Sequence, residues 1–169
     1  MSGRKELRLK HYDYSKRGYY FVTICIKKRA PIFGDVMEGR VKLSEAGKVA
    51  RRCWEEIPDH FGDMEIDEFI VMPDHVHGLL QIESGDENKK GEDNGARNTQ
   101  TIPVVIGNYK ASVTREINEI KPDSNFEWQR SYYEHVIRDE EELREAREYI
   151  KQNPFSWQLD RKNSKGLYR

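Results

Sequence analysis

Residues 71–80, VMPDHVHGLL, indicate a tight turn followed by an apolar strand. Pro73 and Asp74 favour the turn, and the strand begins at His75. Side chains two positions apart on a strand point to the same face, so His75 and His77 stand side by side. One interpretation is a pair of half-exposed histidines on an open sheet face. The other is that both imidazoles bind one divalent metal ion, with a third ligand from elsewhere.

The segments before this strand also predict regular elements. Residues 64–72 predict a strand that forms a hairpin with residues 75–82. Residues 18–29 are rich in aromatic and β-branched side chains and predict an earlier strand. After Ser44, apolar residues recur at helical spacing, which predicts a helix that has Ser44 as its N-cap and ends at Pro58.

The second half of the chain predicts a helix over residues 103–120, a strand over 126–138 and a helix over 139–153 that Pro154 ends. The resulting order of strand, helix, strand, strand, helix and strand is the βαββαβ pattern of ferredoxin-like folds. We therefore predict an α+β protein: a ferredoxin-like sandwich with an antiparallel sheet, helices on one face and an extra C-terminal helix.

The composition sets limits on the class of protein. The 169 residues are an ordinary length for one domain, which we predict to span residues 1–169. The 29 Lys+Arg and 30 Asp+Glu nearly cancel, so the total charge argues neither for nor against nucleic acid. Cys25 and Cys53 form no disulfide framework. With no signal peptide and no membrane-length apolar segment, we expect a cytoplasmic protein without membrane contact.

Two segments at the edges of the predicted elements are polar. Residues 1–17 are basic and predict an N-terminal arm. Residues 83–101 contain one apolar residue, Ala96, and cannot bury surface, so we predict a flexible loop there.

A second set of reactive side chains lies on the last predicted helix. Tyr149 and Asn153 are four residues apart and share a helix face. They are interpreted either as a packing residue and a helix-terminal residue, or as parts of a site. A tyrosine hydroxyl can attack a phosphodiester if a metal ion polarises the phosphate, and an amide oxygen one turn away can be the third metal ligand.

These residues match a known family. MPDHVHGLL resembles the histidine-hydrophobic-histidine motif of the HUH single-tyrosine (Y1) transposases. Residues 128–154, WQRSYYEHVIRDEEELREAREYIKQNP, are similar to the C-terminal block of the REP-associated tyrosine transposase branch, and residues 19–34, YYFVTICIKKRAPIFG, resemble its first strand. The long polar insert at residues 83–101 departs from the family pattern. The resemblance therefore does not predict which residues of this chain border a DNA-binding channel.

The resemblance implies that the protein cleaves and rejoins single-stranded DNA at hairpin-forming repeats, with Mg²⁺ or Mn²⁺, through a 5′-phosphotyrosine intermediate. His75 and His77 fall on the metal ligands, Tyr149 on the nucleophile and Asn153 on the position that can complete the metal site. His135 matches a recurrent histidine that either supports the active site or packs. Subunit arrangement stays open between a monomer and a homodimer that exchanges its tyrosine.

Aromatic residues among basic ones, as in residues 11–20, HYDYSKRGYY, favour contact with the bases and phosphates of DNA, with a solvated basic arm as the alternative. For Tyr132 and Tyr133 we predict core packing. The residues predicted to contact DNA are all positively charged: Arg4, Lys10, Lys16, Arg17, Lys110 and Arg115.

Two other functions are kept beside the metal-dependent transferase. One is a non-catalytic protein that binds DNA hairpins and derives from a transposase. The other is a structural metal protein, which two histidines and an asparagine without a cysteine cluster support poorly.

Overall fold

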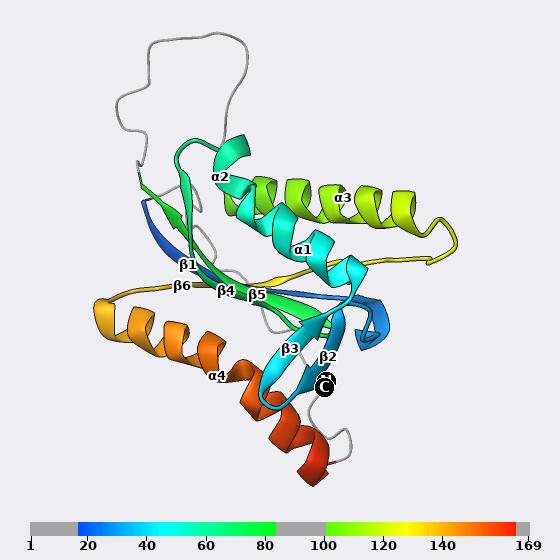
Figure 1. The fold of residues 1–169 in the computed structure, drawn as a ribbon. Coiled ribbons are helices and arrows are strands. Elements are labelled where there is room, and N and C mark those ends of the chain that lie inside the picture. Colours follow the sequence, from blue (N-terminus) through cyan, green and yellow to red (C-terminus); the bar gives the residue numbers. More distant parts are fainter. Residues whose placement is uncertain (1–16, 84–100, 165–169) are drawn as a thin grey trace, which may run out of the picture.

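A four-stranded antiparallel sheet forms the centre of the fold in this computed structural model (Figure 1). The strand order is β4-β5-β1-β6, so β5 and β1 are the two central strands and β4 and β6 are the edges. The strands are β1 (Gly18–Cys25), β4 (Met64–Val71), β5 (His75–Ile82) and β6 (Tyr133–Val136). The structure describes residues 17–83 and 101–164, without the side chains of residues 160–164.

Helices cover both faces of this sheet (Figure 1). On one face lie α1 (Glu45–Glu55), the short α2 (Ile57–His60) and α3 (Ile102–Ile120). On the other face lies α4 (Glu140–Ser164). This arrangement confirms the predicted ferredoxin-like βαββαβ fold with an extra C-terminal helix.

Two small elements follow β1 before α1 begins. The first is a short 3₁₀ turn, η1 (Lys27–Arg29). The second is a two-stranded sheet made of β2 (Gly34–Met37) and β3 (Arg40–Leu43). Ser44 caps α1 as predicted, because its side chain accepts a hydrogen bond from the Gly47 amide at 3.1 Å.

Alternation along the strands divides the side chains between the two faces. In β1, the completely buried Tyr20, Val22 and Ile24 belong to the main core with α1 and α3. Thr23 alternates with them and lies opposite His77 in β5. Cys25 likewise lies opposite His75. The histidine pair therefore belongs to the face that α4 covers.

The structure differs from the prediction at the end of the first helix and in the length of the last strand. Helix α1 ends at Glu55, and Pro58 instead lies in the first turn of α2, where its missing N–H costs no helical hydrogen bond. The last strand is shorter than residues 126–138. Before β6, this segment contributes one isolated bridge, between Trp128 and Ile26.

The prediction that Pro154 ends the last helix is wrong. Helix α4 continues through Pro154 to Ser164. A proline inside a helix removes one backbone hydrogen bond, and contacts made further along offset this cost. The Gln158 side chain accepts a hydrogen bond from the Gly39 amide at 2.9 Å, and the Trp157 ring lies 6.0 Å from the His75 ring.

The predicted arm at residues 1–17 and loop at residues 83–101 lie outside the described residues, apart from Arg17, Glu83 and Thr101. Thr101 is the N-cap of α3 and accepts a hydrogen bond from the Val104 amide at 3.4 Å. None of the helices in the described part of the chain is long and apolar enough to cross a membrane.

An ion pair fixes α4 to the edge strand of the sheet. Arg147 donates two hydrogen bonds to the Asp67 carboxylate, from Nε at 2.8 Å and from Nη2 at 2.7 Å. Asp67 lies where the β4–β5 register shifts, between Ile66 and Phe69. The hydrogen bond from Arg147 lowers the pKa of the Asp67 carboxyl. Packing of Leu79 with Leu143 and Ile150 supports the same contact.

Asp67→Asn is expected to lower the free energy of unfolding by about 1 kcal/mol at pH 7, the upper end for partly exposed pairs, because the contact is bidentate. The folded-state pKa of Asp67 is depressed, so this stability is present above the unfolded pKa of about 3.9 and is lost as the pH falls through the folded-state pKa. Urea unfolding at several pH values measures the difference between variant and wild type.

Glu68→Gln is the matched control, because Glu68 is adjacent and makes a more exposed 3.6 Å pair with Lys151. Its unfolding free energy should stay within about 0.5 kcal/mol of wild type. A difference between Asp67→Asn and wild type that is the same at pH 7 and pH 2.5 would contradict the ion-pair account.

Candidate active site

The histidine pair is buried rather than half-exposed. His75 and His77 are 4% and 6% exposed, and their ring centroids lie 4.4 Å apart. The turn before them is closed by the Met72 amide, which donates to the His75 carbonyl at 2.8 Å. Two adjacent buried imidazoles, which share a sheet face, need polar partners or a ligand.

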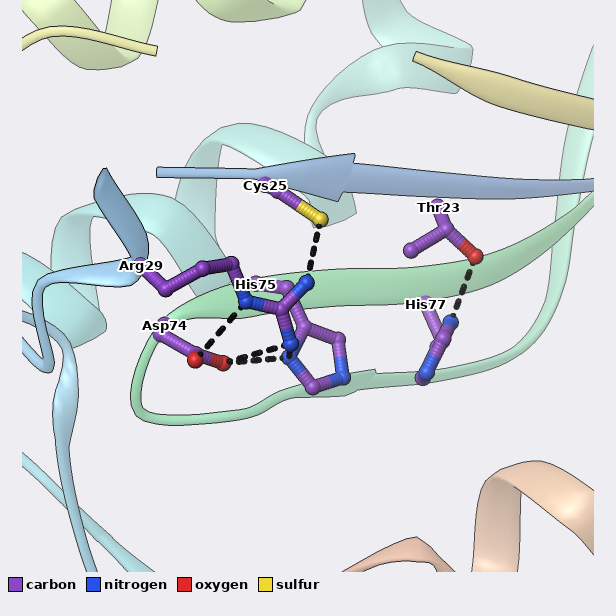
Figure 2. Close-up of polar contacts among 6 residues, drawn as sticks. All are labelled: Thr23, Cys25, Arg29, Asp74, His75 and His77. Atoms are coloured by element: carbon purple, nitrogen blue, oxygen red, sulfur yellow. Dashed lines mark hydrogen bonds and ion pairs between the residues drawn. The ribbon is translucent and has the colours of Figure 1, made fainter. Parts of the chain in front are cut away.

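Each imidazole is held through its Nδ1 atom (Figure 2). His75 Nδ1 lies 2.5 Å from Asp74 Oδ1, and His77 Nδ1 lies 2.7 Å from Thr23 Oγ1. Because an ionised carboxylate only accepts hydrogen bonds, the proton of this contact belongs to His75 Nδ1. The Nε2 atom of His75 then carries a lone pair.

The same tautomer suits His77, since Thr23 Oγ1 can accept from its Nδ1–H. Within residues 17–83 and 101–164, neither Nε2 atom has a hydrogen-bond partner, and Figure 2 draws neither with a dashed line. Histidines that bind metal ions commonly donate their second N–H in this way. The donor set therefore fits a divalent metal ion.

The protonation state of His77 is also compatible with metal binding. Burial lowers the pKa of His77 well below its usual range, and the nearby His75 and Arg29 lower it further. A histidine must be neutral to bind a metal ion, and His77 is neutral at pH 7.

Tyr149 lies on α4, the helix that covers the histidine-bearing face of the sheet, and its ring packs against the histidine pair. Its ring centroid is 5.3 Å from that of His77 and 6.0 Å from that of Phe21. Phe21 itself stacks on His77 at 5.4 Å. Tyr149 is nonetheless 54% exposed, so a ligand in solution can reach its hydroxyl. Tyr149 and His77 come from the same chain.

Asn153 and Trp157 follow Tyr149 at intervals of four residues on the same helix face. Tyr149 contacts His77, and Trp157 lies 6.0 Å from His75, so Asn153 lies between these two contacts. Asn153 is buried. Its role as the third metal ligand stays a prediction.

The described part of the chain holds no group of three or more His, Cys, Asp or Glu side chains that could bind a metal ion. The prediction of Asn153 as third ligand uses an amide oxygen, a type of donor that such a group does not include.

His135 contacts the helix rather than the histidine pair. It lies opposite Phe21 in the β1–β6 register, and its Nε2 pairs with the Glu142 carboxylate in the first turn of α4. This contact ties β6 to α4. A supporting role of His135 in the active site stays a prediction.

The predicted DNA contacts divide between the two faces of the sheet. Lys110 and Arg115 lie on α3, on the face opposite the histidine pair (Figure 1). Lys110 Nζ donates to the Gln129 carbonyl at 2.8 Å. Arg17 is exposed just before β1. The other predicted contacts lie outside the described residues: Arg4, Lys10 and Lys16.

The two neighbouring tyrosines behave differently. Tyr132 packs against the main core as predicted, and its hydroxyl donates to Glu134 Oε1 at 2.9 Å. The core prediction is wrong for Tyr133, which is 43% exposed and has its ring 6.4 Å from that of Phe21. Tyr133 lies in the register position opposite Thr23, so alternation places it on the outer, site-bearing face.

Sequence reasoning missed five residues that contact or support the histidines: Phe21, Thr23, Arg29, Asp74 and Trp157. It assigned Asp74 only to the turn. Trp157 continues the four-residue spacing of Tyr149 and Asn153, which was a usable signal. Thr23 and Arg29 reach the pair only through strand pairing and a turn, which the sequence does not show.

The sequence was compared with those of known proteins and protein families. No protein-family model matches the chain. An uncharacterised protein of Haemophilus influenzae is 39% identical over 172 residues, which cover 93% of this chain and 91% of that protein. A candidate REP-associated tyrosine transposase of the same organism is 26% identical over 151 residues, which cover 84% and 73% of the two chains.

Two solved structures share the fold. A REP-associated tyrosine transposase bound to a REP hairpin has a TM-score of 0.57 and 18% identity, covering 96% of this chain and 88% of that one. A candidate transposase from Deinococcus radiodurans R1 has a TM-score of 0.50 and 17% identity, covering 86% and 96%.

The ferredoxin-like sheet, the paired histidines and the tyrosine on a helix across from them match the pattern that the resemblance to single-tyrosine transposases implies. Within that class, the chain is similar in sequence to a candidate REP-associated tyrosine transposase and shares the fold of a solved one, as its sequence motifs predict.

Proposed function

We propose that this protein is a DNA strand transferase that cuts single-stranded DNA and rejoins it through a 5′-phosphotyrosine bond. The observation that supports this most strongly is the position of Tyr149, 5.3 Å from the His77 ring and 54% exposed. A nucleophile must be both accessible to substrate and close to the groups that activate the phosphate.

His75, His77 and Asn153 are the residues that would hold a Mg²⁺ or Mn²⁺ ion. When bound, the ion would supply Lewis-acid stabilisation of the charge on the phosphate oxygens. The buried imidazoles contribute fixed Nε2 lone pairs, and Phe21 and Trp157 limit the movement of the rings by contact.

The chemistry of this chain rests on the Tyr149 hydroxyl. Its oxygen attacks phosphorus as its proton is lost, and the bond between phosphorus and the 3′ oxygen breaks. The 3′ oxygen takes up a proton and leaves as a free 3′-OH, while the 5′ phosphate stays on Tyr149. Because no water is consumed, attack by another 3′-OH reverses the step and joins strands.

The substrate class is single-stranded DNA with hairpin structure. One relative of known structure is bound to a REP hairpin, and this chain covers 88% of that relative. Within one copy of the chain Tyr149 lies next to His77, so a monomer can bring the tyrosine and the histidine pair together, and a homodimer that exchanges the tyrosine is the alternative arrangement.

The alternative function is hairpin binding without catalysis. The observation in its favour is that a relative of similar fold is bound to a REP hairpin, which needs binding alone. A binding protein would need neither the accessible hydroxyl of Tyr149 nor the buried histidine pair.

A covalent-adduct assay distinguishes the two functions. The protein is mixed with labelled hairpin DNA from the flanks of its own gene, with Mn²⁺ or with EDTA, and run on a denaturing gel. We expect a shifted band with Mn²⁺ that is absent with EDTA and in His75→Ala. His60→Ala is the matched control, because His60 is exposed on α2, and it should keep the band.

Binding in a native gel without an adduct under any metal ion would support the alternative. An adduct that forms equally in EDTA would contradict the assignment of a metal ion to the histidine pair.

A further inference from the structure

We propose that Arg29, acting through Asp74, is a positioning residue that fixes the tautomer and orientation of His75. The inference rests on the proposed function in that it concerns the same histidine pair. It assigns a role to a residue 46 positions away from His75 in the sequence.

The three side chains form a relay (Figure 2). Arg29 donates to Asp74 from Nε to Oδ2 at 2.9 Å and from Nη2 to Oδ1 at 3.4 Å. Asp74 Oδ1 in turn receives the Nδ1–H of His75 at 2.5 Å, and Arg29 Nη2 itself lies 3.4 Å from the same His75 Nδ1. Because a guanidinium only donates, the much shorter contact with the carboxylate decides that Nδ1 carries the proton. Because both carboxylate oxygens are held, the carboxylate cannot rotate away from His75 without losing Arg29.

A third contact fixes the guanidinium group itself. Arg29 Nη1 donates to Cys25 Sγ at 2.8 Å, and Cys25 lies opposite His75 in the β1–β5 register. Arg29 therefore has partners in both β1 and the turn before β5. The planar guanidinium has donors in a rigid fork, which a lysine ammonium cannot reproduce.

The relay is buried where it meets the histidine. Asp74 is 5% exposed and His75 is 4% exposed, so water has little access to replace a lost contact. The Arg29 side chain is 31% exposed at the outer end of the relay. Burial of a charged group is costly unless it is paired and hydrogen-bonded, and Arg29 supplies both to the Asp74 carboxylate.

The backbone at Arg29 is strained. Lys28 and Arg29 have φ values of 60° and 54°, which non-glycine residues rarely adopt. Lys28 is exposed, whereas Arg29 points into the relay. Strain that is retained where a side chain meets reactive groups is characteristic of functional sites.

A structural role for Arg29 is the competing account, in which its charge only neutralises Asp74. The two accounts differ for Arg29→Lys, which keeps the charge but cannot hold both oxygens of Asp74. Positioning predicts that Arg29→Lys behaves like Arg29→Gln at His75, whereas neutralisation predicts that it behaves like wild type.

The first readout is the tautomer of His75 in metal-free protein, measured by long-range ¹H–¹⁵N NMR correlation. We expect the Nδ1–H tautomer alone in wild type, and both tautomers in Asp74→Asn, Arg29→Gln and Arg29→Lys. Lys28→Gln is the matched control, since Lys28 has the same backbone conformation without the contact, and its His75 should match wild type.

The second readout is Mn²⁺ affinity, measured as free Mn²⁺ by EPR without DNA. Arg29→Gln and Arg29→Lys are expected to weaken binding by about 10–100-fold, as changes next to metal-bound histidines do, while Lys28→Gln leaves it unchanged. Thermal melting confirms that each variant compared is folded.

The outcomes separate the two proposals. A mixed-tautomer His75 in wild type, or a wild-type tautomer in folded Arg29→Lys, would overturn the positioning role. If the tautomers behave as expected but wild type binds no Mn²⁺, the positioning role stands and the metal-dependent function fails.

Discussion

Tyr149→Phe is expected to abolish the covalent DNA adduct, with a loss of at least about 10³-fold in the cleavage rate, as when the nucleophile of a covalent mechanism is removed. The substitution deletes one oxygen and keeps the ring that contacts His77 and Phe21. Among the described residues the Tyr149 hydroxyl has no hydrogen-bond partner, so stability should change by no more than about 0.5 kcal/mol. Hairpin affinity in a native gel should stay the same.

Tyr133→Phe is the matched control for this experiment. Tyr133 is also exposed and also lies near Phe21, but it is on β6 and has no ring contact with His77 among the described residues. It should keep the adduct at the wild-type rate. Loss of the adduct in Tyr133→Phe with retention in Tyr149→Phe would move the nucleophile from α4 to the sheet.

Gly78→Ala is expected to give the largest loss of stability, about 3 kcal/mol, because it overfills a packed core. A Cβ atom at Gly78 would lie 2.2 Å from Cζ2 of Trp54. Trp54 is completely buried and is held by Tyr109 at 5.2 Å and Phe69 at 5.9 Å, so it cannot move aside. Thermal unfolding should shift down by roughly 10 °C.

Gly107→Ala is the control, since nothing lies within 4 Å of a Cβ added there on α3. Alanine in a helix interior is favoured over glycine, so this variant should be more stable than wild type by roughly 0.5–1 kcal/mol. If Gly78→Ala proved as stable as wild type, this result would contradict the packing of Trp54 on β5, beside the histidine pair.

Local periodicity was enough to predict much of the site. Strand alternation placed His75 and His77 on one face, and β5 has the predicted bounds. Helical spacing placed Tyr149 and Asn153 together on α4. These predictions succeed because each depends on residues within one element.

The sequence could not show which face of the sheet α4 covers, because periodicity gives the faces of an element but not its neighbours. The same limit applies to Lys110 and Arg115, which lie on α3 across the sheet from the histidines. Long-range partners such as Arg29 and Asp74 are set by the turn geometry after β1. Pro154 misled the prediction because tertiary contacts outweighed its local cost.

The central claim is that Tyr149 carries the DNA, and the most direct measurement is the identity of the peptide attached to it. The adduct is digested with trypsin and nuclease, and the nucleotide-bearing peptide is sequenced by mass spectrometry. We predict a phosphotyrosine-linked nucleotide on residues 148–151, EYIK. A nucleotide on residues 131–138, SYYEHVIR, which contain Tyr132 and Tyr133, would contradict the account.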